Sequence, residues 1–569
     1  MISVLVIRLE RWVRNDRVVL RRYLPIHVST LTRKITFGHE TSEFESLNCL
    51  TLTFGGDGPV PSPGIERVTS SSKRKLRYYY RDARYQLCRS SPGVKILLVK
   101  PKARLGAVLG LQAFQLLEPL ELGYLAGALP SEHTVRILDL RLTRFEDRAF
   151  LGALRRFVPD IVGFTGYTHE GSIVKKLVQT THRYLPLARI VVGGHHATVA
   201  PEDYEIDGID AIVRGEGCAA FRSIVERVKT GNDLFGIANV MIPGDGPQGS
   251  DPTEWPQFPD PSTLPTPRRD LWNPRRYRSV WTGEHLPAWH TLYPPVSMVR
   301  TSWGCKMKCS FCIVPFLCAG EHQTRPVASV VDEIAAAPAD HIYFSDDENF
   351  IDEEFAWQLA ETLEARGVKK RYFAWTRSTT VNRSPELLRK WREIGLDSAF
   401  LGFEFPTDEE LKYAKKGGTV AGNERALDTL RAMGVAVHAA FMVRPEYTEE
   451  QFQKLREYVQ SMPPVQCSFT VCTPSPGTPD YRKMRPKIWI DNPHDLHDCM
   501  HPLTPTTIPL RRFARLFADQ ASAGTAKTPM RVNRHPAPPL DLIRVAAAER
   551  RYHKGFRNMY RDYPRELWE

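Results

Sequence analysis

Three cysteines stand close together near the middle of the chain, in the segment TSWGCKMKCSFCI. Cys305, Cys309 and Cys312 have the spacing C-x3-C-x2-C, and no second Cys/His pair follows at the spacing of a zinc finger. A structural zinc site usually has four protein ligands, so Cys318 or His322 would make an unusual fourth. A cubane iron–sulfur cluster has four irons, and three thiolates would leave one iron open to a substrate or cofactor. The spacing therefore favours an iron–sulfur cluster over zinc.

The cysteine segment follows the first strand of a predicted series of alternating strands and helices. Helical segments such as DEEFAWQLAETLEARG and GNERALDTLRAMG separate the strands, and several end at a glycine, where a helix C-cap is expected. Six β/α units predict a partial barrel over 296–484, with its chemistry at the carboxyl ends of the strands. The predicted strands span 297–303, 341–346, 371–377, 398–405, 435–443 and 467–474.

In this position, the segment resembles the cysteine loop of the radical S-adenosylmethionine (SAM) superfamily, in which an aromatic residue precedes the third cysteine. Phe311 fills the aromatic position. The resemblance implies that Cys305, Cys309 and Cys312 bind a [4Fe–4S] cluster, and that the amino and carboxylate groups of SAM chelate the open iron. One-electron reduction would then cleave SAM to a 5′-deoxyadenosyl radical.

Polar residues follow several other barrel strands. Asp346 and Asp347 follow the second strand, Arg377 ends the third and Glu404 ends the fourth. Taken singly, each fits a surface or capping residue better than a ligand, but all share the strand ends at which barrel enzymes place their active sites. By resemblance to the superfamily, these four residues and Phe311 are predicted to contact SAM. The segment PSPGTPDY after the sixth strand also resembles a recurring segment of this branch.

A second parallel sheet is predicted upstream, over 94–240. Its strands are short, nearly continuous runs of apolar residues, and amphipathic helical segments separate them. This pattern is typical of a doubly wound, Rossmann-like α/β domain whose sheet is covered on both faces. Its predicted strands span 94–101, 134–140, 160–166, 189–194 and 210–217.

The loops after these strands are small and rich in glycine, which lets the backbone approach a large cofactor closely. They contain no G-x-G-x-x-G fingerprint after the first strand, which argues against NAD. Together with the segments EPLELGYLAGAL, VVGGHHAT and VRGEG, they resemble the cobalamin-binding domain of class B radical SAM enzymes. The resemblance implies cobalamin contacts from Thr165, Gly166, Tyr167, Gly193, Gly194, His196, Gly215, Glu216 and Gly217.

Two neighbouring histidines, His195 and His196, lie in one of these loops. Both are candidate metal ligands, but adjacent histidines in a glycine-rich loop more often hydrogen-bond the backbone or the amides of a cofactor. The Asp-x-His-x-x-Gly motif that places a histidine on cobalt in other cobalamin proteins is absent. We therefore expect no cobalt ligand by that route.

The remaining segments differ in composition. Residues 1–93 are expected to form a basic, poorly ordered extension, because residues 1–92 hold 16 Lys/Arg against 8 Asp/Glu and lack sustained periodicity. Residues 241–295 are rich in proline and are predicted to be a linker, and 485–569 a helical C-terminal cap. The formal net charge is +12, of which only +4 falls outside the basic head, so nucleic acid is not an expected partner.

The overall composition is that of a globular protein, with 569 residues, 42% hydrophobic and 25% charged. No run approaches the roughly 18–20 apolar residues of a membrane span, and the opening segment breaks at Arg8 before a signal-peptide apolar region is complete. Ten cysteines without the even spacing of a secreted scaffold favour a reducing compartment. We therefore expect a cytoplasmic protein.

Adjoining cobalamin and SAM sites imply a cobalamin-dependent radical SAM methyltransferase. SAM would methylate cobalamin, and a radical from a second SAM would abstract hydrogen from an unactivated carbon, which then takes the methyl group from methylcobalamin. We expect the substrate, a small molecule or lipid, between the two domains, and an electron donor such as flavodoxin or ferredoxin as a partner. The C-terminal passage HDLHDCMHPLTPTTIPLRRFARLFADQ resembles members that methylate hopanoid lipids.

The sequence leaves other functions open. A cyclase or rearrangement enzyme of natural-product or tetrapyrrole biosynthesis would use the same cofactors, and no motif separates it from a methyltransferase. A methylthiotransferase acting on RNA would hold a second cluster with three cysteines of its first domain, but 94–240 contains only Cys218. A non-catalytic cobalamin sensor would give the cysteine loop no role. An aromatic amino acid or a natural-product scaffold could replace the lipid substrate.

Overall fold

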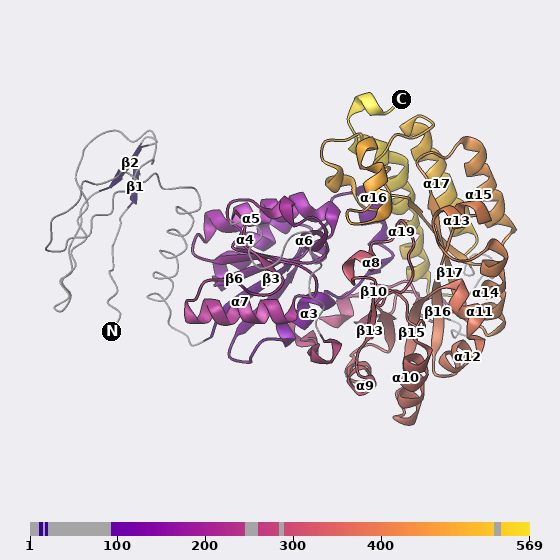
Figure 1. Ribbon diagram of the computed structural model, residues 1–569, viewed down its shortest axis with the longest axis horizontal. Helices are drawn as coiled ribbons and strands as arrows, with labels where there is room; N and C mark the ends of the chain where they lie inside the picture. Colours follow the sequence, from indigo (N-terminus) through magenta and orange to yellow (C-terminus); the bar gives the residue numbers. More distant parts are fainter. Residues whose placement is uncertain (1–10, 15–16, 21–92, 245–259, 284–288, 529–535) are drawn as a thin grey trace. The chain divides into compact units, whose positions relative to one another are not determined.

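The computed structural model describes residues 11–14, 17–20, 93–244, 260–283, 289–528 and 536–569 (Figure 1). Most of the predicted basic extension, and two parts of the predicted linker, lie outside these residues. Near the start, β1 (Arg11–Arg14) and β2 (Arg17–Leu20) pair as an antiparallel hairpin. The hairpin belongs to a unit separate from residues 92–229 and 234–569, which form the second unit and contain both predicted sites.

The first sheet of the larger unit has the strand order β5-β3-β6-β7-β8-β9, with β9 antiparallel to its neighbour. All four residues of β6 and of β7 are buried, as their unbroken apolar runs predict. The order reverses at β3, so the carboxyl ends of β3 and β6 border the crevice in which doubly wound folds bind ligands. Its strands are β3 (Lys95–Lys100), β5 (Thr134–Asp139), β6 (Ile161–Phe164), β7 (Arg189–Val192), β8 (Ala211–Val213) and β9 (Val240–Met241).

Helices cover both faces of this sheet (Figure 1). On one face, α4 (Glu146–Phe157) and α5 (Gly171–Tyr184) bury apolar side chains against the strands. On the other lie α3 (Leu120–Gly127) and α7 (Cys218–Thr230), whose buried residues include Leu120 and Cys218. The predicted doubly wound α/β architecture is confirmed.

The second sheet contains six parallel strands in sequential order, β11-β14-β15-β16-β17-β18, as expected for a partial barrel. Between them run α9 (Val327–Ala336), α10 (Glu353–Ala365), α12 (Pro385–Glu393), α14 (Val420–Ala432) and α15 (Glu449–Ser461). The strands are β11 (Val296–Val299), β14 (His341–Phe344), β15 (Arg371–Thr376), β16 (Leu396–Glu404), β17 (Ala436–Val443) and β18 (Gln466–Val471).

The predicted first barrel strand, 297–303, is divided in the structure. Only β11 belongs to the barrel; β12 (Ser302–Gly304) pairs antiparallel with β13 (His322–Thr324) and closes a hairpin around the cysteine loop. Gly304 has φ 85°, and a Cβ there would lie 1.9 Å from the Glu321 carbonyl oxygen. Continuous apolar patterning could not reveal this turn, because it depends on the close approach of a distant backbone.

The C-terminal residues form the predicted helical cap. Its long helices α17 (Leu510–Ala526) and α19 (Pro539–Asn558) pack on each other, and Phe513 and Phe517 join the barrel core. α19 also packs on α2 (Gly106–Leu111), near which the rings of Phe114 and Tyr552 meet edge to face at 5.6 Å. Among the described residues, no helix is both long and apolar enough to cross a bilayer.

The described part of the predicted linker packs closely instead of running free. Its short strand β10 (Arg278–Ser279) pairs with β4 (Gln115–Leu116) of the first domain. Tyr277 and Trp281 are buried: the Tyr277 hydroxyl donates to Asp139 at 3.1 Å, and the Trp281 indole donates to Asp397 at 2.8 Å. One acceptor belongs to the first sheet and the other to the barrel, so this segment ties the two together.

Candidate functional site

The three loop cysteines are held apart as separate thiols. Cys309 is buried, and Cys305 and Cys312 are partly buried. In the described part of the chain, two groups of three His, Asp or Glu side chains bring their ligand atoms within 4.8 Å of one another, and neither contains a loop cysteine. With three protein thiolates, one iron of a cubane cluster would stay open, as the sequence predicts.

Burial favours the neutral form of two of the loop thiols. Burial raises the pKa of Cys312 to about 12 and also raises the pKa of Cys305. Such thiols would stay protonated at neutral pH in the absence of a metal, whereas coordination to iron deprotonates them outright. The three thiols therefore fit a [4Fe–4S] cluster as its protein ligands.

Two other segments hold the cysteine loop in place. Ser310 donates through its backbone N–H to the Ala414 carbonyl at 3.1 Å and through its hydroxyl to the Asp480 carboxylate at 3.0 Å. The Asp480 N–H in turn donates to the Ser310 carbonyl at 3.2 Å. Asp480 belongs to the PSPGTPDY segment, so the structure gives that sequence signal a role in supporting the loop.

The two aspartates after β14 have different partners. Asp346 is buried and accepts hydrogen bonds from the backbone and hydroxyl of Thr301, from the Ser302 hydroxyl and from the Asn349 amide. Its carboxylate is therefore occupied in fixing the backbone that leads into the loop. Asp347 accepts from the Gly304 N–H at 2.9 Å and faces a cavity, where a cofactor group can reach it.

Arg377 and Glu404 lie at neighbouring strand ends and share Lys416. Arg377 donates through Nη1 to the Cys309 sulfur at 3.6 Å and through Nη2 to the Lys416 carbonyl, and its Nε has no partner in the structure. Glu404 accepts from the Lys416 ammonium at 2.6 Å and has φ 66°, a strained conformation for a residue other than glycine. Strain of this kind gathers at functional sites, and here it lies beside the cluster loop.

Phe311 does not face the cavity. Its ring packs against the apolar group Phe405, Leu411, Ala414 and Met442, which lies beneath the loop. Phe311 thereby fixes the loop on the barrel.

Sequence reasoning missed Glu348. Its side chain is buried, Oε1 accepts from the Thr376 hydroxyl at 3.0 Å, and Oε2 has no partner in the structure. Burial raises its pKa to about 7. Glu348 does not line the cavity described below, and its raised pKa reflects its burial. The three consecutive acidic residues Asp346, Asp347 and Glu348 were the feature of the sequence that could have indicated this residue. The sequence alone does not say which of the three carboxylates is left without a partner.

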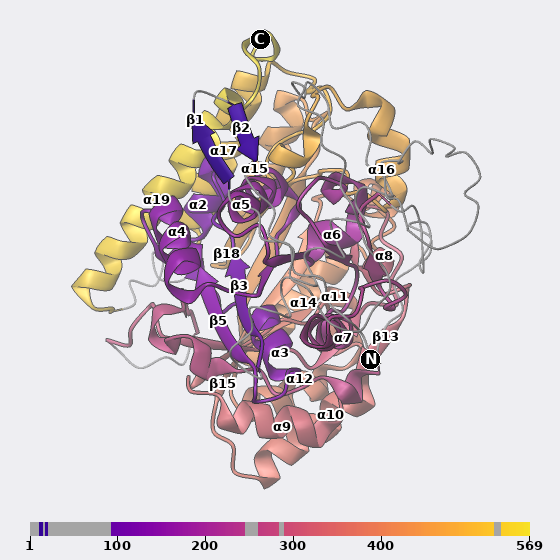
Figure 2. The same ribbon diagram turned by 90° about the vertical axis from the view of Figure 1, so that its left-hand side faces the viewer.

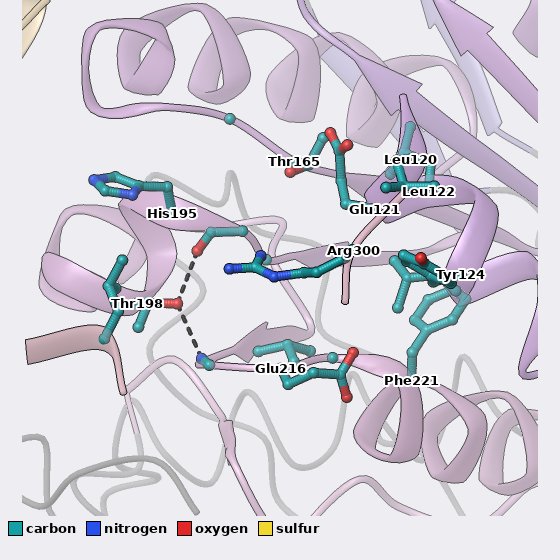
Figure 3. A pocket seen from close by; sticks show the side chains of 18 of the residues that line it. Leu120, Glu121, Leu122, Tyr124, Thr165, His195, Thr198, Glu216, Phe221 and Arg300 are labelled. Atoms are coloured by element: carbon teal, nitrogen blue, oxygen red, sulfur yellow. Dashed lines mark hydrogen bonds between the residues drawn. The ribbon is translucent and has the colours of Figure 1, made fainter. Parts of the chain in front are cut away.

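A cavity of about 400 Å³ opens at the carboxyl ends of the first sheet (Figure 3). Of the predicted cobalamin contacts, all but His196 line it: Thr165, Gly166, Tyr167, Gly193, Gly194, Gly215, Glu216 and Gly217. Its apolar walls include Leu120, Leu122 and Phe221. Its size falls within the range of sites for small molecules and cofactors.

The glycines of this cavity bring backbone close to its interior. Gly194 has φ 91°, and a Cβ there would lie 2.4 Å from the Thr165 hydroxyl. The Thr198 hydroxyl donates to the Gly194 carbonyl at 2.8 Å and accepts from the Gly215 N–H at 2.9 Å, which joins two of the strand-end loops (Figure 3). At these glycines the cavity is lined by backbone, which suits the close approach of a bulky cofactor.

Residues from the barrel close the opposite side of the same cavity. Met298, Arg300 and Trp303 come from β11, β12 and the turn between them, and Asp347 follows β14. The Arg300 guanidinium extends toward Thr198 in Figure 3, and it pairs with Asp347 at 3.3 Å. Val314, Leu317 and Cys318, which directly follow the cysteine loop, also line the cavity. The predicted cobalamin site and the cluster loop therefore border one continuous space.

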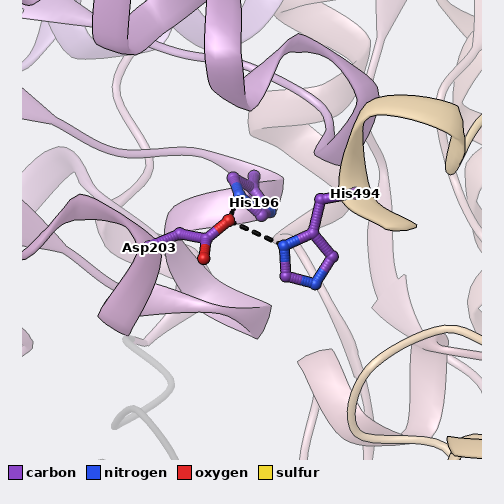
Figure 4. A group of neighbouring side chains, drawn as sticks. All are labelled: His196, Asp203 and His494. Atoms are coloured by element: carbon purple, nitrogen blue, oxygen red, sulfur yellow. Dashed lines mark hydrogen bonds and ion pairs between the residues drawn. The ribbon is translucent and has the colours of Figure 1, made fainter. Parts of the chain in front are cut away.

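The paired histidines take opposite positions, which corrects the prediction for His196. His196 is fully buried behind the cavity, where its Nε2 lies 3.0 Å from Asp203 Oδ2, and His494 Nδ1 lies 2.7 Å from the same oxygen (Figure 4). His195 lines the cavity instead, and burial lowers its pKa to about 4, so it is neutral at physiological pH. Both belong to α6 (His195–Val199), where successive side chains point about 100° apart.

Charged side chains also join the two domains beside the cavity. Glu333 on α9 accepts from the Tyr124 hydroxyl at 3.1 Å, from Arg325 at 2.7 Å and from Arg269 at 3.0 Å. Both Glu333 and Arg325 are buried. Tyr124 belongs to α3 of the first domain, so this group fixes one wall of the cavity against the barrel. No short motif announced it, because its members are far apart in the sequence.

Comparison with known proteins agrees with this arrangement. Residues 106–225 match the B12 binding domain, and residues 299–459 match the radical SAM superfamily. Hopanoid C-3 methylase of Methylococcus capsulatus is 27% identical over 408 residues, which cover 71% of this chain and 75% of that protein. Anaerobic magnesium-protoporphyrin IX monomethyl ester cyclase of Cereibacter sphaeroides is 26% identical over 389 residues, covering 65% of this chain and 61% of that protein.

A solved structure shares the fold. The radical S-adenosylmethionine methyltransferase TsrM from Kitasatospora setae, solved with cobalamin and a [4Fe–4S] cluster, has a TM-score of 0.52 at 20% identity, covering 68% of this chain and 77% of that chain. The two domain matches account for both regions described above, the cradle and the cysteine loop. The chain is therefore a radical SAM enzyme with a B12-binding domain, whose cofactors are a [4Fe–4S] cluster, SAM and cobalamin.

Proposed function

We propose that this enzyme is a C-methyltransferase that transfers a methyl group to an unactivated carbon of an apolar substrate. The observation that carries the proposal is the shared cavity: residues of the cobalamin cradle and residues next to the cysteine loop line the same space. A methyl donor on one side and a radical source on the other must both reach one substrate carbon. A single cavity bordered by both sites meets that requirement.

When bound, the three cofactors supply reductive cleavage of SAM to a radical and a methyl group for transfer. Cys305, Cys309 and Cys312 would hold the cluster, and Asp347, Arg377 and Glu404 would contact SAM. The chain's own residues bind and position the reactants and exclude water from the radical. The ion pairs of Glu333 with Arg269 and Arg325 support the positioning of the reactants, because they hold the walls of the cavity together.

We further propose a lipid of the hopanoid type as the substrate. The cavity walls carry Leu98, Leu125, Val213, Leu317 and other apolar side chains, beside charged ones such as Lys100, Glu121 and Arg300. The relative from Methylococcus capsulatus is named as a hopanoid methylase. Burying a fused apolar ring system against such walls is favourable by roughly 25 cal/mol per Å².

The decisive experiment is an anaerobic assay. The purified chain is reconstituted with iron, sulfide and hydroxocobalamin, reduced with titanium(III) citrate, and supplied with SAM labelled in its methyl group. Label is expected in a hopanoid substrate and not in tryptophan or a peptide panel. Cleavage of SAM without transfer of label to any substrate would contradict the proposed methyl transfer. Retention of cobalamin without SAM cleavage would indicate a cobalamin sensor instead.

A second candidate is a cyclase that uses the same cofactors. The observation favouring it is the similarity to the anaerobic cyclase of Cereibacter sphaeroides over 65% of this chain. The same assay separates the two functions when magnesium-protoporphyrin IX monomethyl ester is included. Consumption of that compound with formation of a new ring, and no label gained, would support the cyclase.

We also propose a cytoplasmic location and a protein electron donor such as flavodoxin or ferredoxin. The eight cysteines in the described part of the chain are all free, which suits a reducing compartment. Reductive cleavage needs one electron per SAM, and the cluster and cobalamin can pass electrons on but are not a net source of them, so a donor outside the enzyme must supply the electron.

A further inference from the structure

A group of exposed basic side chains borders the cysteine loop; we call it the basic surface. Two of its members alternate with the cluster cysteines, two lie on or just after α13 (Asp408–Tyr413), and four lie on α16 (Pro479–Met484) and the following turn. Its members are Lys306, Lys308, Lys412, Lys415, Arg482, Lys483, Arg485 and Lys487, all of them exposed.

The three segments of the basic surface are in direct contact. Ser310 bonds to Ala414, just after α13, and to Asp480 on α16. Met307 lies against the turn after α13, since a Cβ on Gly417 would be 3.2 Å from its methyl carbon. In Figure 1, α13, α16 and α8 (Val314–Leu317), which follows the loop, lie near one another. The basic residues therefore surround one site, although they are nearly 180 residues apart in the sequence.

Little negative charge on these segments balances the basic surface. Within the described chain, none of its eight members forms an ion pair within 4.0 Å. The exposed acids on the same segments are Asp408 and Glu409, whereas Asp480 is buried and Glu404 is paired with Lys416. Crowded like charges repel and do not stabilise the fold. Complementary charge on a partner is the physical use that such a surface has.

We propose that the basic surface docks an acidic one-electron carrier protein that reduces the cluster, an inference that rests on the proposed function. Lys306 follows Cys305 and Lys308 precedes Cys309, and consecutive Cα atoms are about 3.8 Å apart, so a partner that contacts these lysines approaches the cluster ligands directly. One electron leaves the carrier and enters the cluster, and no bond is made or broken at the surface.

A buried contact continues from this surface toward the cluster. Lys416, beside Lys415, accepts through its carbonyl from Arg377, whose Nη1 lies 3.6 Å from the Cys309 sulfur. The surface thus borders the cluster side of the barrel, while the cavity lies behind the loop. A carrier can dock without entering the substrate space.

The test compares two charge-reversal variants of the reconstituted holoenzyme. The first is Lys412→Glu with Arg482→Glu and Lys483→Glu, which spares the residues adjoining the cysteines. The matched control is Arg550→Glu with Arg551→Glu and Lys554→Glu on α19, which has the same change in charge on a helix that packs on α2 and α17. Figure 2 shows α19 and α16 on opposite sides of the ribbon.

The measurements are the Kd for an acidic flavodoxin at 50 and 300 mM salt and the rate of cluster reduction by its hydroquinone. We expect the surface variant to weaken binding at least about tenfold at low salt and to lose most of the salt dependence, with the control close to wild type. Reduction by titanium(III) citrate should be unchanged in all three proteins, because a small reductant needs no docking surface.

Two results would overturn the inference. One is equal flavodoxin affinity and equal reduction rate in all three proteins. The other is wild-type binding of an RNA oligonucleotide, lost in the surface variant, with no flavodoxin binding at all. Failure of the proposed methyl transfer has a different signature: no labelled product with titanium(III) citrate, while flavodoxin binding still follows the charge of the surface.

Discussion

The cysteine loop and the cobalamin cradle differ in how their parts come together. The loop draws its three thiols from eight consecutive residues, and its supports only fix an arrangement that the spacing already specifies. The cradle is assembled from several strand ends of one sheet and is closed by residues from the barrel. A local site should therefore fail by loss of a ligand, and an assembled site by loss of packing or of contacts between the domains.

The sharpest way to test this difference is to remove a loop ligand. Cys309→Ser is expected to abolish cluster assembly and SAM cleavage, because one of three thiolate ligands is lost. Cobalamin binding should remain stoichiometric, since the cradle does not include Cys309. Iron and sulfide analysis, together with the absorbance of bound cobalamin, measures both. Loss of cobalamin together with iron would show that the two regions are not independent.

The next largest effect is expected from breaking the ion pairs of Glu333, which join the two domains. Glu333→Gln removes the charge that faces buried Arg325, and leaving such a charge uncompensated typically costs about 3–5 kcal/mol, whereas Arg269 keeps its ion pair with Glu118. Urea unfolding should show this loss, and cobalamin should dissociate faster because a wall of its cavity loosens.

The matched control for Glu333→Gln is the substitution Asp332→Asn at the neighbouring position. Asp332 pairs with Arg366, and both side chains are exposed, so the expected loss is at most about 1 kcal/mol. Equal losses in the two variants would contradict a role for Glu333 beyond that of a surface ion pair.

The acidic strand end predicts a pH dependence of stability. Glu348 has a pKa of about 7 in the folded protein against an ordinary value of 4.5, so the folded state binds a proton that the unfolded state releases between these values. The free energy of unfolding should therefore fall as pH rises from about 4.5 to 7, by up to about 3 kcal/mol. Glu348→Gln should remove this part of the pH dependence.

Urea titrations of the wild type and the variant from pH 5 to pH 8 measure the effect. Glu354→Gln, on the exposed face of α10, serves as the control and should follow the wild type. If the free energy of unfolding depended on pH in the same way for the wild type and for Glu348→Gln, the buried carboxyl would not be the cause of the pH dependence.

A smaller effect is expected from filling the cradle. Gly194→Val places a side chain against the Thr165 hydroxyl at a positive φ, and cobalamin affinity should fall at least about tenfold, while the cluster content stays unchanged. Gly236→Val is the matched control, because Gly236 also has a positive φ but nothing within 4 Å of a Cβ. Equilibrium dialysis of cobalamin against both variants gives the comparison. Equal affinities would mean that Gly194 matters only for the turn.

Several features of the fold and the site were predictable from residue order. Unbroken apolar runs predict parallel strands such as β6 and β7, because both faces of such a strand are buried. All but one of the contacts predicted at glycine-rich strand ends line the cavity. The division of the first barrel strand at Arg300 and Thr301 was missed, because it depends on the pairing of Ser302–Gly304 with the returning strand His322–Thr324.

The side-chain partners were less predictable than the elements. Asp346 and Asp347 are adjacent and chemically identical, yet one is buried among donors of the loop and the other faces the cavity. His195 and His196 differ in the same way, because one helical step turns a side chain from the cavity toward Asp203. Sequence patterns locate such pairs but do not choose between their members.

The sequence by itself determined the chemistry: three thiols at one spacing, an order of strands and helices, and glycines at the strand ends. These are local properties, set by covalent neighbours and by the period of apolar residues. Only the tertiary structure decided which carboxylate lacks a partner, which histidine faces the cavity and which distant cations gather beside the cysteine loop. Those outcomes depend on contacts between different segments of the chain, and such contacts form only when the chain packs.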